Sequence, residues 1–206
     1  MIARGSATLV FLPAVGMVAA MAAALLLRNI YAVYASLPLG LLFLFFLAFF
    51  RDPERVPARG IVSPADGRVL QVDAERGVLI VFMNLHNVHV NRAPWGGRVT
   101  RMTYSPGGHA PAYRREAAHN ERLETVLDTD LGQVRILQVA GVFARRIVPY
   151  RREGDRVKKG QRIGMIRFGS RVELTLPRGV HLVAKVGDRV RAGETAVAVV
   201  ERGAVR

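Results

Sequence analysis

Three short stretches of the sequence combine reactive side chains with residues that favour turns. They are residues 63–67 (Ser-Pro-Ala-Asp-Gly), residues 86–92 (His-Asn-Val-His-Val-Asn-Arg) and residues 168–173 (Phe-Gly-Ser-Arg-Val-Glu). Each has an ordinary structural explanation, because Pro-Ala-Asp-Gly and Gly-Ser are common turn sequences. Together they offer an aspartate, histidines and a serine from separate segments, which are the residue types that activate a hydroxyl group.

The serine of the third stretch directly follows a glycine. No Gly-x-Ser-x-Gly sequence surrounds Ser170, so the nucleophile of an α/β-hydrolase is disfavoured. A second reaction is open to this side chain, because its Oγ can attack the carbonyl group of the preceding residue. Gly169 leaves that carbonyl sterically open and its backbone free to distort. The substrate of such an attack is the chain itself.

A metal site is disfavoured by the residues that are available. The sequence contains no cysteine, which excludes thiolate zinc sites, iron–sulfur clusters, disulfides and cysteine nucleophiles. His86 and His89 have the spacing of a metal half-site, but no glutamate stands between them as in a zincin helix. We therefore expect no metal ion.

Charge and hydrophobicity together point to a membrane. The chain has 206 residues, enough for one domain and an attachment, and half of them are hydrophobic. Lys and Arg total 30 against 16 Asp and Glu, a formal net charge of +14. This combination favours a membrane or another polyanionic surface. A nucleic-acid-binding protein is disfavoured because no motif of that class is present.

Two runs without charged residues, 6–27 and 30–50, are separated only by Arg28 and Asn29. Each run is long enough to cross the hydrocarbon core of about 30 Å as a helix. We expect a transmembrane hairpin in residues 1–50; a signal peptide and a shallow hairpin within one leaflet are the alternatives. The arginines that flank its open end predict that this end is cytoplasmic; they are Arg4, Arg51, Arg55 and Arg59.

Residues 51–206 should form a mainly β domain. Short β-branched runs alternate with glycine-containing turns, which predicts antiparallel strands; the clearest runs are 68–72, 78–83, 98–104, 122–127 and 133–139. A Gly-Asp-Arg-Val-x-x-Gly unit occurs at 154–160 and again at 187–193. Duplicated units of this kind resemble the barrel-sandwich of lipoyl and biotinyl carrier domains.

Five motifs in register resemble the compact phosphatidylserine decarboxylase proenzymes. To the three stretches above they add residues 51–53 (Arg-Asp-Pro) and 120–122 (Asn-Glu-Arg). The resemblance covers about residues 48–200. It implies an enzyme that cuts its own Gly-Ser bond, converts the serine into an N-terminal pyruvoyl cofactor, and then decarboxylates phosphatidylserine to phosphatidylethanolamine.

Carried onto this sequence, the resemblance implies cleavage between Gly169 and Ser170. The products would be a β chain of residues 1–169 and an α chain of residues 170–206, with Ser170 as the source of the pyruvoyl group. His89 would take the proton of Ser170, Asp66 would orient the ring of His89, and His86 would serve the decarboxylation. Because positions three apart on a strand face opposite sides, the backbone must turn between the two histidines, and Asn87 favours that turn. The roles of the two histidines could also be exchanged.

The remaining expectations concern partners and an alternative function. Clusters of basic residues would hold anionic lipid against the membrane; they are Arg114, Arg115, Arg145, Arg146, Arg151, Arg152, Lys158 and Lys159. The resemblance implies a homodimer and an inner-membrane enzyme, and leaves phosphatidylserine and archaetidylserine open as substrates. The alternative is a membrane-anchored adaptor or carrier without enzymatic activity, which the duplicated unit favours.

Overall fold

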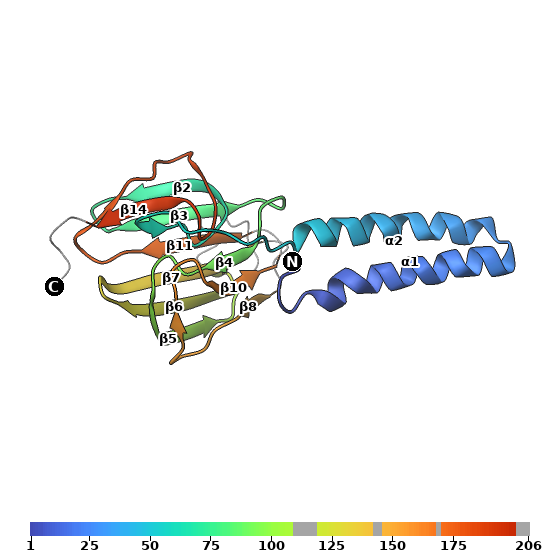
Figure 1. Ribbon diagram of the computed structural model, residues 1–206, viewed down its shortest axis with the longest axis horizontal. Helices are drawn as coiled ribbons and strands as arrows, with labels where there is room; N and C mark the ends of the chain where they lie inside the picture. The colour runs from blue at the N-terminus through green and yellow to red at the C-terminus, as the bar shows by residue number, and fades with distance from the viewer. Residues whose placement is uncertain (109–118, 142–145, 168–169, 201–206) are drawn as a thin grey trace. The chain divides into compact units, whose positions relative to one another are not determined.

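The computed structural model describes residues 1–108, 119–141, 146–167 and 170–200. The chain divides into two compact units, Met1–Pro53 and Glu54–Arg206. We call them the helical unit and the β unit, and each is described by itself (Figure 1).

The helical unit is a hairpin of two helices, α1 (Ala7–Leu27) and α2 (Ile30–Phe49). Arg28 adopts a left-handed conformation at the tight connection, and the side chain of Asn29 accepts a hydrogen bond from the backbone N–H of Tyr31. A backbone hydrogen bond from Ala3 to Phe50 joins the two ends of the hairpin. Both helices are long and apolar enough to cross a membrane, and their bounds agree with the predicted spans.

The β unit contains antiparallel strands in every pairing that the described residues make. The strands are β1 (Ile61–Val62), β2 (Gly67–Asp73), β3 (Val78–Met83), β4 (Val90–Arg92), β5 (Gly97–Ser105), β6 (Arg122–Thr129), β7 (Gly132–Ala140), β8 (Ile147–Pro149), β9 (Arg156–Val157), β10 (Arg162–Ile166), β11 (Ser170–Thr175), β12 (Val180–Leu182), β13 (Arg189–Val190) and β14 (Ala196–Val200).

The largest sheet is curled and has the order β13-β2-β3-β11-β7-β6-β5-β9 (Figure 1). Two three-stranded sheets accompany it, with the orders β1-β14-β12 and β4-β10-β8. Strand β11 lies inside the large sheet, paired with β3 on one side and β7 on the other. The prediction of a mainly β, antiparallel domain is confirmed, whereas its barrel-sandwich arrangement stays a prediction.

Alternating side chains explain how the strands build a core. Along β3 and β11, every second residue is buried, as expected for strands with one face on a hydrophobic core. Val81 of β3 and Val172 of β11 are directly paired and fully buried, and Ile136 of β7 belongs to the same core. The β-branched runs in the sequence therefore fix both the strands and the face that each one buries.

The two Gly-Asp-Arg-Val-x-x-Gly units form the short strands β9 and β13. These strands lie at opposite edges of the large sheet. The first and last glycines of both units have positive φ angles, as the turns on either side require. The repeated sequence thus supplies a similar edge strand twice.

Candidate functional site

Ser170 is the first residue of β11 and is completely buried. Its strand partners are Met83, the last residue of β3, and Ala140, the last residue of β7. Among the described residues, the hydrogen bond of its Oγ goes to the sulfur of Met83, at 3.3 Å. A thioether is a weak acceptor, so the hydroxyl group is shielded from water and its acceptor among the described residues is weak.

Two buried amide side chains are linked to this serine through the sulfur of Met83. The Nε2 of Gln138 donates to Oδ1 of Asn91 at 2.7 Å, and Nδ2 of Asn91 lies 3.7 Å from the sulfur of Met83. Asn91 belongs to β4 and Gln138 to β7, and both are at most 1% exposed. We call Ser170, Met83, Asn91 and Gln138 the serine cluster.

Asn91 and Gln138 have no role in the site predicted from the sequence. The available signal was composition, because asparagine is depleted in strands and Asn91 stands between Val90 and Arg92 in a β-forming run. A buried amide at such a position needs a partner. Its partner was not predictable from spacing along the chain.

His89 and His86 differ in burial. His89 directly precedes β4 and is 1% exposed, whereas His86 is exposed. The residues between β3 and His89 make a turn in which the N–H of Asn87 donates to the carbonyl of Asn84 and the N–H of Asn84 donates to Oδ1 of Asn87. This turn spans residues 84–87, so it contains His86 and ends at Asn87, two residues before His89.

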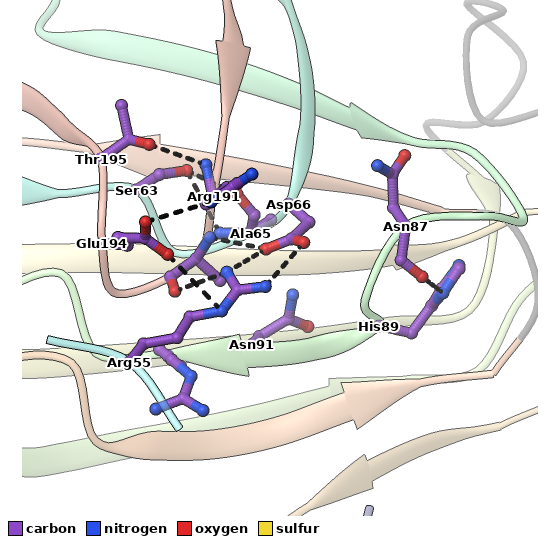
Figure 2. A network of polar contacts seen from close by, with 12 residues as sticks. Arg55, Ser63, Ala65, Asp66, Asn87, His89, Asn91, Arg191, Glu194 and Thr195 are labelled. Atoms are coloured by element: carbon purple, nitrogen blue, oxygen red, sulfur yellow. Dashed lines mark hydrogen bonds and ion pairs between the residues drawn. The ribbon is translucent and has the colours of Figure 1, made fainter. Parts of the chain in front are cut away.

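The ring of His89 has a defined hydrogen bond at Nδ1. This atom lies 2.9 Å from the carbonyl oxygen of Asn87 (Figure 2). Because a carbonyl oxygen only accepts, the neutral ring carries its proton on Nδ1, and Nε2 is the basic nitrogen. The ring therefore has the tautomer that a general base needs.

Asp66 lies at the end of the predicted turn 63–67 and is buried. Its carboxylate accepts two hydrogen bonds from Arg55, at 2.5 and 2.9 Å, and one from the N–H of Ala192, at 2.7 Å (Figure 2). Arg55 also donates to the carbonyl of Ala192 at 2.9 Å. We call Arg55, Asp66 and the backbone of Ala192 the carboxylate cluster.

The turn that carries Asp66 depends on glycine. Gly67 has a φ of +150°, and a Cβ atom there would lie 1.9 Å from the carbonyl oxygen of Phe82. Only glycine lets β2 start this close to β3. The predicted role of glycine in the turn is thus tied to a close approach between strands.

The structure does not show the predicted hydrogen bond between Asp66 and His89. Within the described part of the chain, Asp66 bonds with Arg55 and Ala192, and the Nδ1 position of His89 faces the carbonyl of Asn87. The roles given to Asp66, His89 and His86 stay predictions. Gly169, on the other side of the predicted cleavage point, lies outside the described residues.

Positive charge lies close to Ser170 along the chain. The backbone N–H of Arg167 donates to the carbonyl of Arg146. Burial, together with the charge of Arg146, lowers the pKa of Arg167 from its ordinary value. Two guanidinium groups therefore share this region, which favours anionic ligands.

The predicted basic clusters are only partly described. Arg114, Arg115 and Arg145 lie outside the described residues. In each of the pairs 151–152 and 158–159, one member binds backbone carbonyls: Arg151 donates to Arg162, and Lys159 donates to Ala58 and Gly60. Their binding of anionic lipid stays a prediction.

Comparison with known proteins now decides the family. The family model described as "Phosphatidylserine decarboxylase" matches residues 42–198. The chain belongs to the phosphatidylserine decarboxylase family. The residues that carry the sequence resemblance lie within this match, so the resemblance is confirmed, and the chain is assigned to an enzyme class rather than to adaptors or carriers.

Curated relatives in the phosphatidylserine decarboxylase family are similar over most of the chain. A phosphatidylserine decarboxylase proenzyme of Thermobifida fusca is 51% identical over 151 residues, which cover 71% of this chain and 70% of the relative. A protein of Archaeoglobus fulgidus, provisionally named as an archaetidylserine decarboxylase proenzyme, is 51% identical over 152 residues, 74% of this chain and 76% of the relative. A protein of Methanococcoides burtonii with the same provisional name is 47% identical over 171 residues, which cover 82% of this chain and 80% of the relative.

Proposed function

We propose that this chain is a precursor that cuts itself between Gly169 and Ser170, and that the cut enzyme converts phosphatidylserine into phosphatidylethanolamine. The observation that carries the proposal is the setting of Ser170, whose buried hydroxyl group follows a glycine in the chain and has a weak acceptor at Met83. The names of the relatives, which include the word proenzyme, support processing.

The first step of cleavage is an attack by Ser170 on its own backbone. As a bond forms between Oγ and the carbonyl carbon of Gly169, the bond from that carbon to the nitrogen of Ser170 breaks, which turns an amide into an ester. His89 takes the proton from Oγ at Nε2 and returns a proton to the departing nitrogen. The hydrogen bond of Nδ1 to the carbonyl of Asn87 keeps Nε2 available for this transfer.

The ester then breaks by elimination within Ser170. Loss of the Cα proton and of the Cβ–Oγ bond releases Gly169 as a carboxylate and leaves dehydroalanine at position 170. Addition of water to this residue releases ammonia and leaves a pyruvoyl group at the new N-terminus. The buried position of Ser170 fits this origin, since no external cofactor has to enter.

The pyruvoyl group supplies a sink for the electrons that remain on the serine headgroup when carbon dioxide leaves. The chain's own residues hold the headgroup and return a proton. Arg146 and Arg167 would bind its anionic groups. His86, exposed on the turn before His89, would supply the proton that replaces carbon dioxide.

Strand pairing explains how the cut enzyme would stay together. The fragment that begins at Ser170 contains β11, which pairs with β3 and β7 of the other fragment. It also contains β13 and β14, which pair with β2 and β1. The two fragments would therefore separate only under denaturing conditions.

The helical unit would anchor the enzyme in the inner membrane, with the β unit on the cytoplasmic side. The two apolar helices support membrane association, and the arginines at the open end of the hairpin support the orientation. A homodimer remains part of this proposal. Archaetidylserine is the second candidate substrate, because relatives of equal similarity carry either name.

The proposal is tested with purified protein and vesicles that contain phosphatidylserine. Ser170→Ala should stay in one piece and release no carbon dioxide. His86→Ala should still be cut but decarboxylate about 10²–10⁴-fold more slowly, the range of general acid catalysis. Thr175→Ala, at the far end of the same strand, is the matched control and should behave as wild type.

Two outcomes of this experiment would count against the proposal. A processed Ser170→Ala protein would overturn self-cleavage by this serine. An uncut His86→Ala protein would show that the roles of His86 and His89 are exchanged. Replacing phosphatidylserine by archaetidylserine in the vesicles decides which lipid is the substrate.

A further inference from the structure

The amide of Asn91 has an unusual acceptor for a buried donor. Within the described residues, its Nδ2 is directed to the sulfur of Met83, at 3.7 Å. Oγ of Ser170 lies against the same sulfur atom, at 3.3 Å. Buried amide groups normally have strong acceptors, and a thioether is a weak one. Within the described residues, this buried donor therefore shares a weak acceptor with the reactive serine.

Gln138 fixes the direction of this donor. The Nε2 of Gln138 donates to Oδ1 of Asn91 at 2.7 Å. A thioether accepts but does not donate, so the NH₂ group of Asn91 faces Met83 and its oxygen faces Gln138. Gly164 of β10 leaves room for this arrangement, because a Cβ atom there would lie 3.2 Å from Nε2 of Gln138.

In the proposed self-cleavage, negative charge develops on the carbonyl group that is bonded to Ser170. The attacked carbonyl carbon is bonded to the nitrogen of Ser170, so its oxygen lies within a few bond lengths of Oγ. As Oγ attacks, this oxygen becomes an oxyanion. A fixed donor that has a weak partner before the reaction and a strong one during it lowers the barrier selectively.

We propose that Asn91 is a further catalytic residue of self-cleavage, whose amide N–H stabilises the oxyanion formed when Ser170 attacks the preceding carbonyl group. Gln138 is the positioning residue that aims this N–H. The inference rests on the proposed function, since it needs the reaction at Ser170. It assigns a task to two buried amides that the roles of Asp66, His86 and His89 leave unused.

The decisive variant replaces both amides, Asn91→Leu with Gln138→Leu. Removing both partners of a buried hydrogen bond by apolar groups of similar shape is close to neutral for stability. The full-length double variant should therefore fold and yet cut itself about 10²–10³-fold more slowly, the loss found for one oxyanion donor. Fragment formation is followed over time on a denaturing gel, and folding by the thermal unfolding midpoint.

A second variant and a matched control separate chemistry from folding. Asn91→Asp keeps the shape but replaces the donor by a carboxylate, so it should also be slow. Thr175→Val changes the opposite end of β11 from Ser170 and should cut at the wild-type rate. A folded double variant that cuts within threefold of wild type would overturn the role of Asn91.

Hydroxylamine supplies a readout that a structural role would not change. It cleaves esters, so it fragments a precursor that has completed the attack but is blocked afterwards. Hydroxylamine should not speed the slow fragmentation of the double variant, because its defect precedes the ester. Faster fragmentation at position 170 in hydroxylamine than without it would contradict the inference.

Different results would overturn the proposed function and the inference about Asn91. If Ser170→Ala is still processed, the proposed function is wrong and the inference falls with it. If wild type is cut before Ser170 and the double variant is cut equally fast, the inference alone is wrong.

Discussion

The two buried polar clusters of the β unit differ in how well their donors match their acceptors. In the carboxylate cluster, the side chains of Arg55 and Asp66 are 6% and 9% exposed, and the charges meet in a two-pronged contact completed by Ala192. In the serine cluster, a hydroxyl group and an amide share the sulfur of Met83. Buried charges that have strong hydrogen-bond partners stabilise the folded structure. Donors whose described acceptor is weak can bind a stronger acceptor that forms during a reaction.

Position in the chain adds to this difference. The carboxylate cluster joins residues that precede the proposed cut to Ala192, which follows it. It would thus connect the two fragments after cleavage, while the serine cluster contains Ser170, the first residue after the proposed cut. We expect changes in the first cluster to appear in stability and changes in the second to appear in rate.

The largest expected effect on stability is that of Arg55→Met. This change leaves the carboxylate of Asp66 buried without its charged partner, which costs about 3–5 kcal/mol of unfolding free energy. The measurement is urea unfolding in a Ser170→Ala background, followed by the fluorescence of Trp95, the single tryptophan.

The matched control for Arg55→Met removes both charges, Arg55→Met with Asp66→Leu. It should regain most of the lost stability, because no isolated buried charge remains. A loss below about 1 kcal/mol for Arg55→Met alone would show that the carboxylate cluster is not the stabilising element assumed here.

A smaller effect is expected from Met83→Leu in the serine cluster. The two side chains have similar volume, so the unfolding free energy should change by less than about 1.5 kcal/mol. Self-cleavage should continue, because the sulfur is only the resting acceptor of Ser170 and Asn91. A folded Met83→Leu protein that never cuts would mean that the sulfur takes part in the reaction.

The smallest effect is expected from Glu54→Gln. This change removes the ion pair between Glu54 and Arg162, which is more exposed than the ion pair between Arg55 and Asp66. Arg162 donates a hydrogen bond to Glu54 at 2.8 Å, and this bond, with the charge of Arg162, holds the pKa of Glu54 below its usual value. A lowered carboxyl pKa stabilises the folded state at neutral pH, and this contribution is lost as the pH falls through the folded-state pKa.

Thermal unfolding of Glu54→Gln and wild type should therefore differ slightly at pH 7 and not at all in acid. Exposed ion pairs contribute little. If Glu54→Gln destabilised the protein as strongly as Arg55→Met, burial would not be what separates the two ion pairs.

Local patterns predicted much of the fold. The uncharged runs 6–27 and 30–50 became α1 and α2, and the β-branched run 78–83 became β3 with the same bounds. Periodicity and turn residues act over a few positions, so they are visible in the sequence. The burial of Ser170 and the tautomer of His89 needed the structure.

Long-range partners could not be predicted in the same way. Asn91 of β4 and Gln138 of β7 are 47 positions apart in the chain and belong to different sheets. Arg55 reaches Asp66 from a segment without regular structure. In the predicted site Asp66 orients His89, whereas the described contacts of Asp66 are with Arg55 and Ala192. Such contacts depend on strand register and not on spacing.

The central claim is that Ser170 cuts the bond before it, and an intact-mass spectrum of the purified protein under denaturing conditions tests it most directly. The account predicts two masses, one for residues 1–169 and one for residues 170–206 with a pyruvoyl group and no N-terminal amine. A single mass for all 206 residues from a folded, active preparation would contradict it.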